Sequence, residues 1–275
     1  MKKGLLVATI LVLACGAMCQ VRTPRSITAS SQQAAAKQQM YVGNISPEST
    51  TACKYTFTSG NGIRYLKYCV TNNGNITQFE SPKGVEYIQT GTIGEGYAFC
   101  DFDSSTAYFD YAGYGDSGNW QPTKQTAKTA TGVKFSRATN DGIYTLTQSI
   151  DQDAGNVLAD VTMGIKNNSG SSHHIGLLRY ADVDANSSML NDFDYTFHTA
   201  LGYNSGVNGL QERYVSGAAL NGAFTQDISG GPDACQPFEH VLAPLAGVDG
   251  SIFIQYDITL APGATSTVKV NYKAF

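Results

Sequence analysis

The chain has 275 residues, a net charge of −4 and only 15% charged side chains. Nucleic-acid binding relies on clustered Lys and Arg that neutralise phosphates, and this acidic excess argues against that class of partner. Beyond the first 20 residues, no apolar run reaches the roughly 18 residues that a membrane-spanning helix needs. The low charge, together with 29 Gly and 16 Tyr, is typical of an extracellular β-rich protein.

The N-terminus reads as an export signal. Lys2 and Lys3 precede the apolar stretch Leu5–Leu13, which is long enough for a signal-peptide core and too short to span a bilayer. Small residues near Cys19 predict cleavage after it, so 1–19 is the expected signal peptide of a secreted or periplasmic protein. The alternative is a lipid anchor at Cys15, because 12–15 resembles a bacterial lipobox.

The mature chain divides into two parts. The segment 20–49 is rich in Ser, Ala and Gln and has no apolar stripe, so we expect a flexible tether. The remainder, 50–275, is expected to form a single domain.

Four cysteines of the mature chain predict two disulfides, because an even count in an oxidising compartment is normally paired. If Gly60-Asn61-Gly62 closes a hairpin, Cys53 falls opposite Cys69 at a separation that suits a disulfide. Cys100 and Cys235 then pair by elimination. The cysteines lack the close ligand spacing of a zinc site.

The remaining segments alternate apolar and polar residues with a period of two, which indicates strands over 157–166, 252–258 and 267–274. Gly- and Asn-rich turns such as 72–75, 140–142 and 167–170 separate the strands. The fold class predicted is all-β, an antiparallel β-sandwich with two disulfides.

Three segments, 142–148, 161–169 and 178–184, together with the closing Leu260-Ala261-Pro262-Gly263 and its strand, resemble the galactose-mutarotase-like super-sandwich domains of secreted bacterial proteins. The resemblance covers roughly residues 75–275. It implies a super-sandwich that binds or acts on carbohydrate.

An acidic run offers hard oxygen ligands at the spacing with which a calcium loop begins. These residues are Asp182, Asp184, Asn186, Asp192 and Asp194. The run lacks the Gly and Glu of an EF-hand, so the alternative is a turn whose side chains bond nearby backbone amides. Calcium is the one ion suggested, and no cofactor is required.

Candidate catalytic residues lie close to this run. If Asp194 and His198 share a face with Arg179, they could form the floor of a sugar site in which a carboxylate and an imidazole exchange a proton. The alternative is a solvated ion-pair face. His173 and His174 are adjacent, so in a strand they point to opposite faces and cannot share a metal ion.

A Gly-rich segment carries a cluster of aromatic residues, which suits stacking on sugar rings or on a protein partner. Its members are Tyr108, Tyr111, Tyr114 and Trp120. The alternative is that they cap the core.

Three functions follow from these features. The first is a secreted, non-catalytic carbohydrate-interacting β-sandwich. The second is a carbohydrate-active enzyme on the same fold, an epimerase, lyase or hydrolase. The third is a structural or adhesive module whose partner is another envelope protein.

Overall fold

A computed structural model of the chain describes residues 51–88, 94–153, 155–204, 207–227, 231–236 and 244–275. The expected signal peptide (1–19), the tether (20–49) and the alternative anchor Cys15 lie outside these residues. The helical elements described are two 3₁₀ turns, η2 (Gly62–Arg64) and η3 (Ala185–Ser187). Within these ranges no helix is long and apolar enough to cross a membrane.

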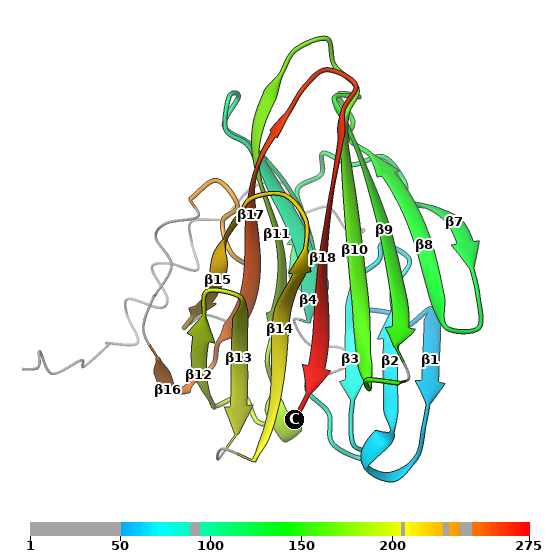
Figure 1. Cartoon of the computed structure of the whole chain (residues 1–275), viewed down its shortest axis with the longest axis vertical. Helices are drawn as coiled ribbons and strands as arrows, with labels where there is room; N and C mark the ends of the chain where they lie inside the picture. Colours follow the sequence, from blue (N-terminus) through cyan, green and yellow to red (C-terminus); the bar gives the residue numbers. More distant parts are fainter. Residues whose placement is uncertain (1–50, 89–93, 154, 205–206, 228–230, 237–243) are drawn as a thin grey trace, which may run out of the picture.

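The strands form three antiparallel sheets (Figure 1). The smallest has the order β1 (Tyr55–Ser59), β2 (Leu66–Val70), β3 (Ile76–Glu80). The next has the order β15 (Leu220–Gln226), β17 (Ser251–Leu260), β11 (His173–Asp182), β4 (Glu95–Asp101), β5 (Thr106–Tyr111), β6 (Gly115–Asp116). The largest has the order β16 (Leu245–Val248), β12 (Asn191–Thr196), β13 (Thr199–Asn204), β14 (Asn208–Ser216), β18 (Thr265–Ala274), β10 (Leu158–Asn167), β9 (Tyr144–Asp153), β8 (Gly132–Ala138), β7 (Lys124–Lys128).

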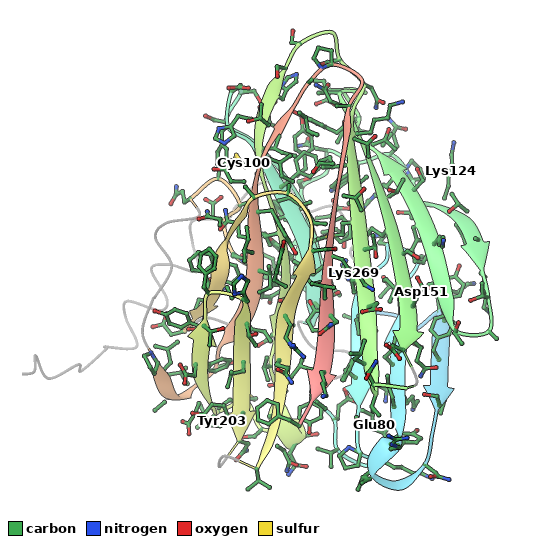
Figure 2. All side chains as sticks on the ribbon, in the orientation of Figure 1. Glu80, Cys100, Lys124, Asp151, Tyr203 and Lys269 are labelled. Atoms are coloured by element: carbon green, nitrogen blue, oxygen red, sulfur yellow. A yellow bond between two sulfur atoms is a disulfide. The ribbon has the colours of Figure 1, made fainter. Side chains whose placement is uncertain are left out.

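The two smaller sheets pack on the same face of the nine-stranded sheet. On the six-stranded side, the ring of Phe99 lies 5.1 Å from that of Tyr144. On the three-stranded side, the ring of Tyr55 lies 5.7 Å from that of Phe135. The opposite face is polar and carries the Lys269–Asp160 ion pair (Figure 2). The expected all-β antiparallel sandwich is therefore confirmed, with β10, β17 and β18 in the predicted places.

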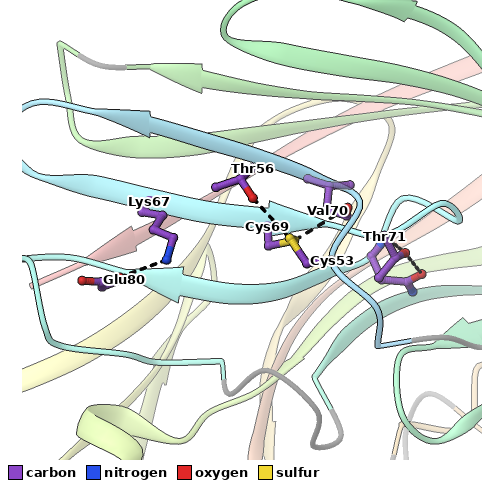
Figure 3. Close-up of a disulfide and its surroundings, with 8 residues drawn as sticks. Cys53, Thr56, Lys67, Cys69, Val70, Thr71 and Glu80 are labelled. Carbon is purple, nitrogen blue, oxygen red and sulfur yellow. Dashed lines mark hydrogen bonds and ion pairs between the residues drawn. A yellow bond between two sulfur atoms is a disulfide. The ribbon is translucent and has the colours of Figure 1, made fainter.

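Both predicted disulfides are present, Cys53–Cys69 and Cys100–Cys235. The hairpin register behind the first differs from the expectation: Cys69 lies opposite Thr56 (Figure 3). The turn η2 lengthens the connection, so Ser59 pairs with Leu66 and Cys53 precedes β1. Cys53 still reaches Cys69, with 5.6 Å between their Cα atoms.

The turn between β2 and β3 is buried where the three sheets meet. The carbonyl of Asn73 accepts hydrogen bonds from Tyr97 Oη at 3.1 Å and Gln148 Nε2 at 3.2 Å. Gly74 has φ +87°, and a Cβ there would lie 2.8 Å from Gln148 Nε2. The positive φ favours glycine, and any larger residue would also displace the Gln148 side chain. The Asn- and Gly-rich sequence of this turn is typical of a surface loop, yet the turn lies in the interior of the protein.

A buried ion pair lies beside the same turn and contacts it. Arg179 Nη2 donates to Glu95 Oε2 at 2.6 Å, and its Nε also contacts this carboxylate. The guanidinium further donates to Gln148 Oε1 at 2.5 Å and to the carbonyl of Gly74 at 2.9 Å. Tyr272 Oη completes the set by donating to Glu95 at 3.0 Å. Arg179 thus links all three sheets.

A second arginine repeats the arrangement nearer β5. Arg137 Nη1 donates to Asp110 Oδ2 at 2.5 Å and Nη2 donates to Asp116 Oδ2 at 3.1 Å. Asn73 Nδ2 also donates to Asp110, at 2.9 Å, so the β2–β3 turn contacts both networks. The guanidinium lies 5.0 Å from the ring centre of Trp120.

The two disulfides should contribute unequally to stability. They close loops with sequence separations of 16 and 135 residues, and the longer loop loses more entropy in the unfolded chain. We expect Cys100→Ser/Cys235→Ser to lower the unfolding free energy by roughly 2 kcal/mol more than Cys53→Ser/Cys69→Ser. Urea denaturation measures both values, and equal losses would contradict the expectation.

Removal of Arg179 should be severely destabilising. Arg179→Met leaves the Glu95 carboxylate buried without its cation, for which we expect a loss of about 3–5 kcal/mol in urea denaturation. Arg179→Met/Glu95→Leu should recover part of this loss, since both charges are then removed. The matched control is Arg213→Met at an exposed position of β14, with an expected change within about 0.5 kcal/mol. A single variant no less stable than the double variant would refute a pair-specific role.

Candidate functional site

The predicted aromatic surface is largely part of the core. Tyr108, Tyr111 and Trp120 are each at most 5% exposed, and Tyr114 is half-buried. Trp120 donates through Nε1 to the carbonyl of Phe109 at 3.0 Å. The interpretation of these residues as an exposed stacking platform is therefore wrong for the three buried rings, because neighbouring strands already cover them.

The three candidate catalytic residues do not share a face. Arg179 is fully buried in its ion pair with Glu95. Asp194 is exposed on β12, where its Oδ1 accepts the amide of Tyr195 at 2.7 Å. His198 is exposed in the β12–β13 turn, with its ring 5.5 Å from that of Tyr214. The expected floor of a sugar site is not assembled from these residues.

The predicted calcium ligands separate into different surroundings. Asp192 Oδ1 accepts the amide of Gly247 at 2.9 Å, and Asn186 is exposed in η3 with φ 56°. Asp182 and Asp184 remain at the end of β11, where both are buried. The acidic run is thus divided among the η3 turn, strand β12 and one buried pair.

The buried pair forms part of an acidic end. The amide of Asp182 donates to Gly94 at 2.8 Å and that of Asp184 to Tyr87 at 2.9 Å. Val183 donates to the carbonyl of Gly250 at 3.2 Å, which brings Asp249 into the same region. Asp182 Oδ1 has no hydrogen-bond partner among the described residues. We name Asp182, Asp184 and Asp249 the acidic end.

Burial and mutual repulsion perturb these carboxyl groups. Burial raises the pKa of Asp184 to about 6, and the charges of Asp249 and Glu86 contribute to the rise. Burial raises the pKa of Asp182 well above its ordinary value, with Asp184 and Asp249 adding to the effect. Perturbed carboxyl groups of this kind are common at functional sites.

A cleft of about 540 Å³ opens between β15, β17 and β18. Four of its lining side chains can form hydrogen bonds, and the others are apolar. The lining residues are Ala218, Ala219, Leu220, Asn221, Asp257, Ile258, Thr259 and Ser266. Its volume lies within the range of small-molecule sites. This cleft is the second candidate feature.

A histidine orients the carboxylate of the cleft. His174 Nε2 contacts Asp257 Oδ1, and both side chains are about half exposed. The ring of Phe102 lies 5.0 Å from that of His174. His173, by contrast, faces inward and contacts Asp101. The prediction that the two histidines point to opposite faces is confirmed.

Sequence reasoning missed Asp249, Asn221 and Asp257. Their places depend on the pairing of β17 with β11 and β15, which joins segments distant in the chain. The turn Asp249-Gly250 before an alternating strand was a local signal of a strand start, but it did not indicate the partner strand. Asn221 carries no local signal.

No protein-family model and no curated protein sequence matches the chain. Among solved structures, a bacterial glucoamylase complexed with acarbose is similar with a TM-score of 0.62 and 12% identity over 84% of this chain. The chain spans about a third of that glucoamylase, 33% of its length. At this identity the likeness shows the fold alone.

Two further structures are similar at lower scores. A putative aldose 1-epimerase from Escherichia coli K12 has a TM-score of 0.48 and 11% identity, with 80% of this chain and 99% of that chain covered. A galactose mutarotase-like protein from Lactobacillus casei ATCC 334 has a TM-score of 0.45 and 10% identity, with 80% and 100% covered. A galactose mutarotase-like protein is thus among the solved structures to which the chain is similar.

Proposed function

We propose that this protein is an exported carbohydrate-binding protein whose ligand occupies the cleft between β15, β17 and β18. The supporting observation is the chemistry of the cleft lining. The lining residues include Asn221, Asp257, Thr259 and Ser266, which carry hydrogen-bond donors and acceptors, together with the apolar residues Leu220 and Ile258. Sugars present both hydroxyl groups and apolar C–H faces, so a mixed lining of this kind suits them.

The charge of the cleft agrees with a neutral glycan. Among the described residues, its lining includes one carboxylate and no Lys or Arg, which disfavours phosphorylated or sulfated ligands. His174 holds the Asp257 carboxylate in place, which reduces the side-chain entropy lost when a ligand hydroxyl binds it. The fold is also similar to that of one third of a bacterial glucoamylase solved with acarbose. The two disulfides are consistent with export to an oxidising compartment.

Glycan binding should depend on Asp257. We expect Asp257→Ala to weaken binding of a neutral oligosaccharide by about 10-fold or more, since a hydrogen bond to a charged group contributes about 1.5–3 kcal/mol. Isothermal titration calorimetry on ligands selected by thermal shift gives the affinities. Asp194→Ala, which removes an exposed carboxylate outside the cleft, is the matched control. Equal affinities for the two variants would refute the cleft as the site.

A second candidate function is a carbohydrate-active enzyme that uses the acidic end. The observation in its favour is that Asp184, with its pKa raised to about 6, lies near two further carboxyl groups. A carboxyl group with such a pKa can donate a proton near neutral pH. A calcium ion held by Asp182, Asp184 and Asp249 is the alternative use of this region, and the first two of these belong to the predicted set. If no glycan bound, a protein partner of the envelope would become the leading hypothesis.

The acidic end should make stability depend on pH. The pKa of Asp184 is about 6 in the folded protein and 3.8 in its reference state, so the folded protein holds a proton that the unfolded chain releases. Stability should therefore fall as pH rises from about 4 to about 6. We expect Asp184→Asn to melt at a higher temperature than the wild type at pH 8 and at a similar temperature at pH 4.

Asp194→Asn is the control for this comparison. A difference in melting temperature between Asp184→Asn and the wild type that is the same at pH 4 and pH 8 would contradict the prediction. Calcium provides a further test at pH 8. If the acidic end binds calcium, about 5 mM Ca²⁺ should raise the melting temperature of the wild type and leave that of Asp184→Asn unchanged. This concentration is on the order of the dissociation constants of weak calcium sites in proteins, or above them. An equal response of both proteins would exclude a calcium site at Asp184.

A further inference from the structure

A second cluster of potential metal ligands lies at the opposite end of β11 from the acidic end. Asp101 ends β4, Asp103 follows it, and His173 begins β11. One ligand atom from each lies within 4.8 Å of the others. The neighbouring β10–β11 and β17–β18 connections lie side by side at the top of Figure 1, where the amide of Asn167 donates to the carbonyl of Ala264 at 2.9 Å.

The direction of the hydrogen bonds here can be assigned from Asn167. Its Nδ2 lies 2.7 Å from the carbonyl oxygen of Ser171 and 3.2 Å from that of Leu260. Carbonyls only accept, so Nδ2 and Oδ1 are distinguished. Oδ1 accepts the amide of Ser169 at 2.9 Å and lies 2.7 Å from Ser169 Oγ. Ser169 Oγ also lies 3.1 Å from the carbonyl oxygen of Ser171, so the single hydroxyl proton of Ser169 is donated to one of two oxygens that can only accept.

This direction determines the state of His173. Because Ser169 Oγ donates its proton to another oxygen, its contact with His173 Nε2 at 2.9 Å must be a hydrogen bond donated by the ring. A neutral imidazole carries one N–H, which leaves Nδ1 with a lone pair. Nδ1 lies 3.0 Å from Asp101 Oδ2, which is also an acceptor. Two acceptors at this distance require a positive charge between them, either a second proton or a cation.

The same direction excludes a nucleophilic role for Ser169. Ser169, His173 and Asp101 are spaced as in a Ser–His–Asp triad, in which the imidazole takes the hydroxyl proton. Here the ring donates to the hydroxyl, so Ser169 is not activated. The arrangement instead matches a histidine that binds a metal ion through one nitrogen and is oriented by a hydrogen bond at the other.

A buried hydroxyl adjoins this cluster on the side of the core. Tyr144 is fully buried, and its ring lies 5.5 Å from that of His173. Its Oη makes no hydrogen bond of good geometry among the described residues. Burial raises the pKa of this hydroxyl, and a side-chain interaction with the Asp101 carboxylate raises it further, so Asp101 is the group nearest to its charge. A buried hydroxyl with so poorly aligned a partner is unusual.

We propose that Asp101, Asp103 and His173 bind a divalent transition-metal ion of the zinc type. His173 Nδ1 and one oxygen of each carboxylate are the ligands, and the buried ring of Tyr144 packs against His173. One nitrogen with two oxygens is a donor set that suits zinc, whereas calcium prefers oxygen alone. The Asp101 side chain is 1% exposed and that of His173 14%, while Asp103 is exposed, so an ion can enter from the Asp103 side.

Metal titration of the purified, chelator-treated protein tests the proposal. Isothermal titration calorimetry with Zn²⁺, and the absorption spectrum of bound Co²⁺, should show one equivalent bound. Loss of a ligand in Asp103→Asn or His173→Gln should remove this binding. Ser169→Ala should weaken it by about 10- to 100-fold, as is usual when a ligand loses its orienting hydrogen bond. His174→Gln changes the adjacent residue on the opposite face, and Zn²⁺ affinity should be unchanged.

The positive charge beside Asp101 could also be a second proton on the His173 ring. Nitrogen NMR of the histidine rings distinguishes this proton from a bound metal ion. A zinc site predicts that Zn²⁺ shifts the Nδ1 resonance of His173 and leaves that of His174 in place. The proposal is overturned if Zn²⁺ shifts neither resonance and both nitrogens of His173 are protonated at pH 7. It is also overturned if His174→Gln, rather than Asp103→Asn, abolishes binding. Because Asp103 is exposed, Asp103→Asn should fold. The proposal can therefore still be tested if His173→Gln fails to fold.

Discussion

The three sheets depend on one buried turn, Thr71–Asn75, and on the two arginines beside it. Buried backbone groups need hydrogen-bond partners, and the turn obtains them from side chains of both larger sheets. The carbonyls of Asn73 and Gly74 accept bonds from Gln148 and Arg179. Any shift of one sheet would leave a charge or a carbonyl without its partner, which is costly inside a protein. The position of the sheets is therefore determined by polar contacts as well as by apolar packing.

The strand β11 passes through three different environments in this arrangement. At its start His173 contacts Asp101 near the surface, in its middle Arg179 is wholly buried, and at its end Asp182 belongs to the acidic end. Polar residues of similar kind thus take different roles along one strand. The middle of the strand holds the fold together, so chemistry that needs solvent or a ligand is confined to its two ends.

Local sequence patterns predicted the strands and the cysteine pairs correctly, although they did not give the hairpin register. The Cys53–Cys69 disulfide was predicted correctly although the register was not, because η2 changes the loop length without separating the two cysteines. The aromatic segment misled for the opposite reason. Its Gly-rich composition suggested an exposed loop, but Trp120 is covered by Tyr97 and Phe99 of β4, which lies earlier in the chain.

The sequence by itself determined the period of the strands, the cysteine pairing and the all-β class, because these depend on residues near one another or on simple counting. Only the tertiary structure decided which polar side chains are buried and which meet. Alternation separates two faces of a strand, but it does not say what covers either face. His174 and Asp257 are 83 residues apart, and they meet only because β11 pairs with β17. Such long-range pairing is decided by the packing of the whole sandwich.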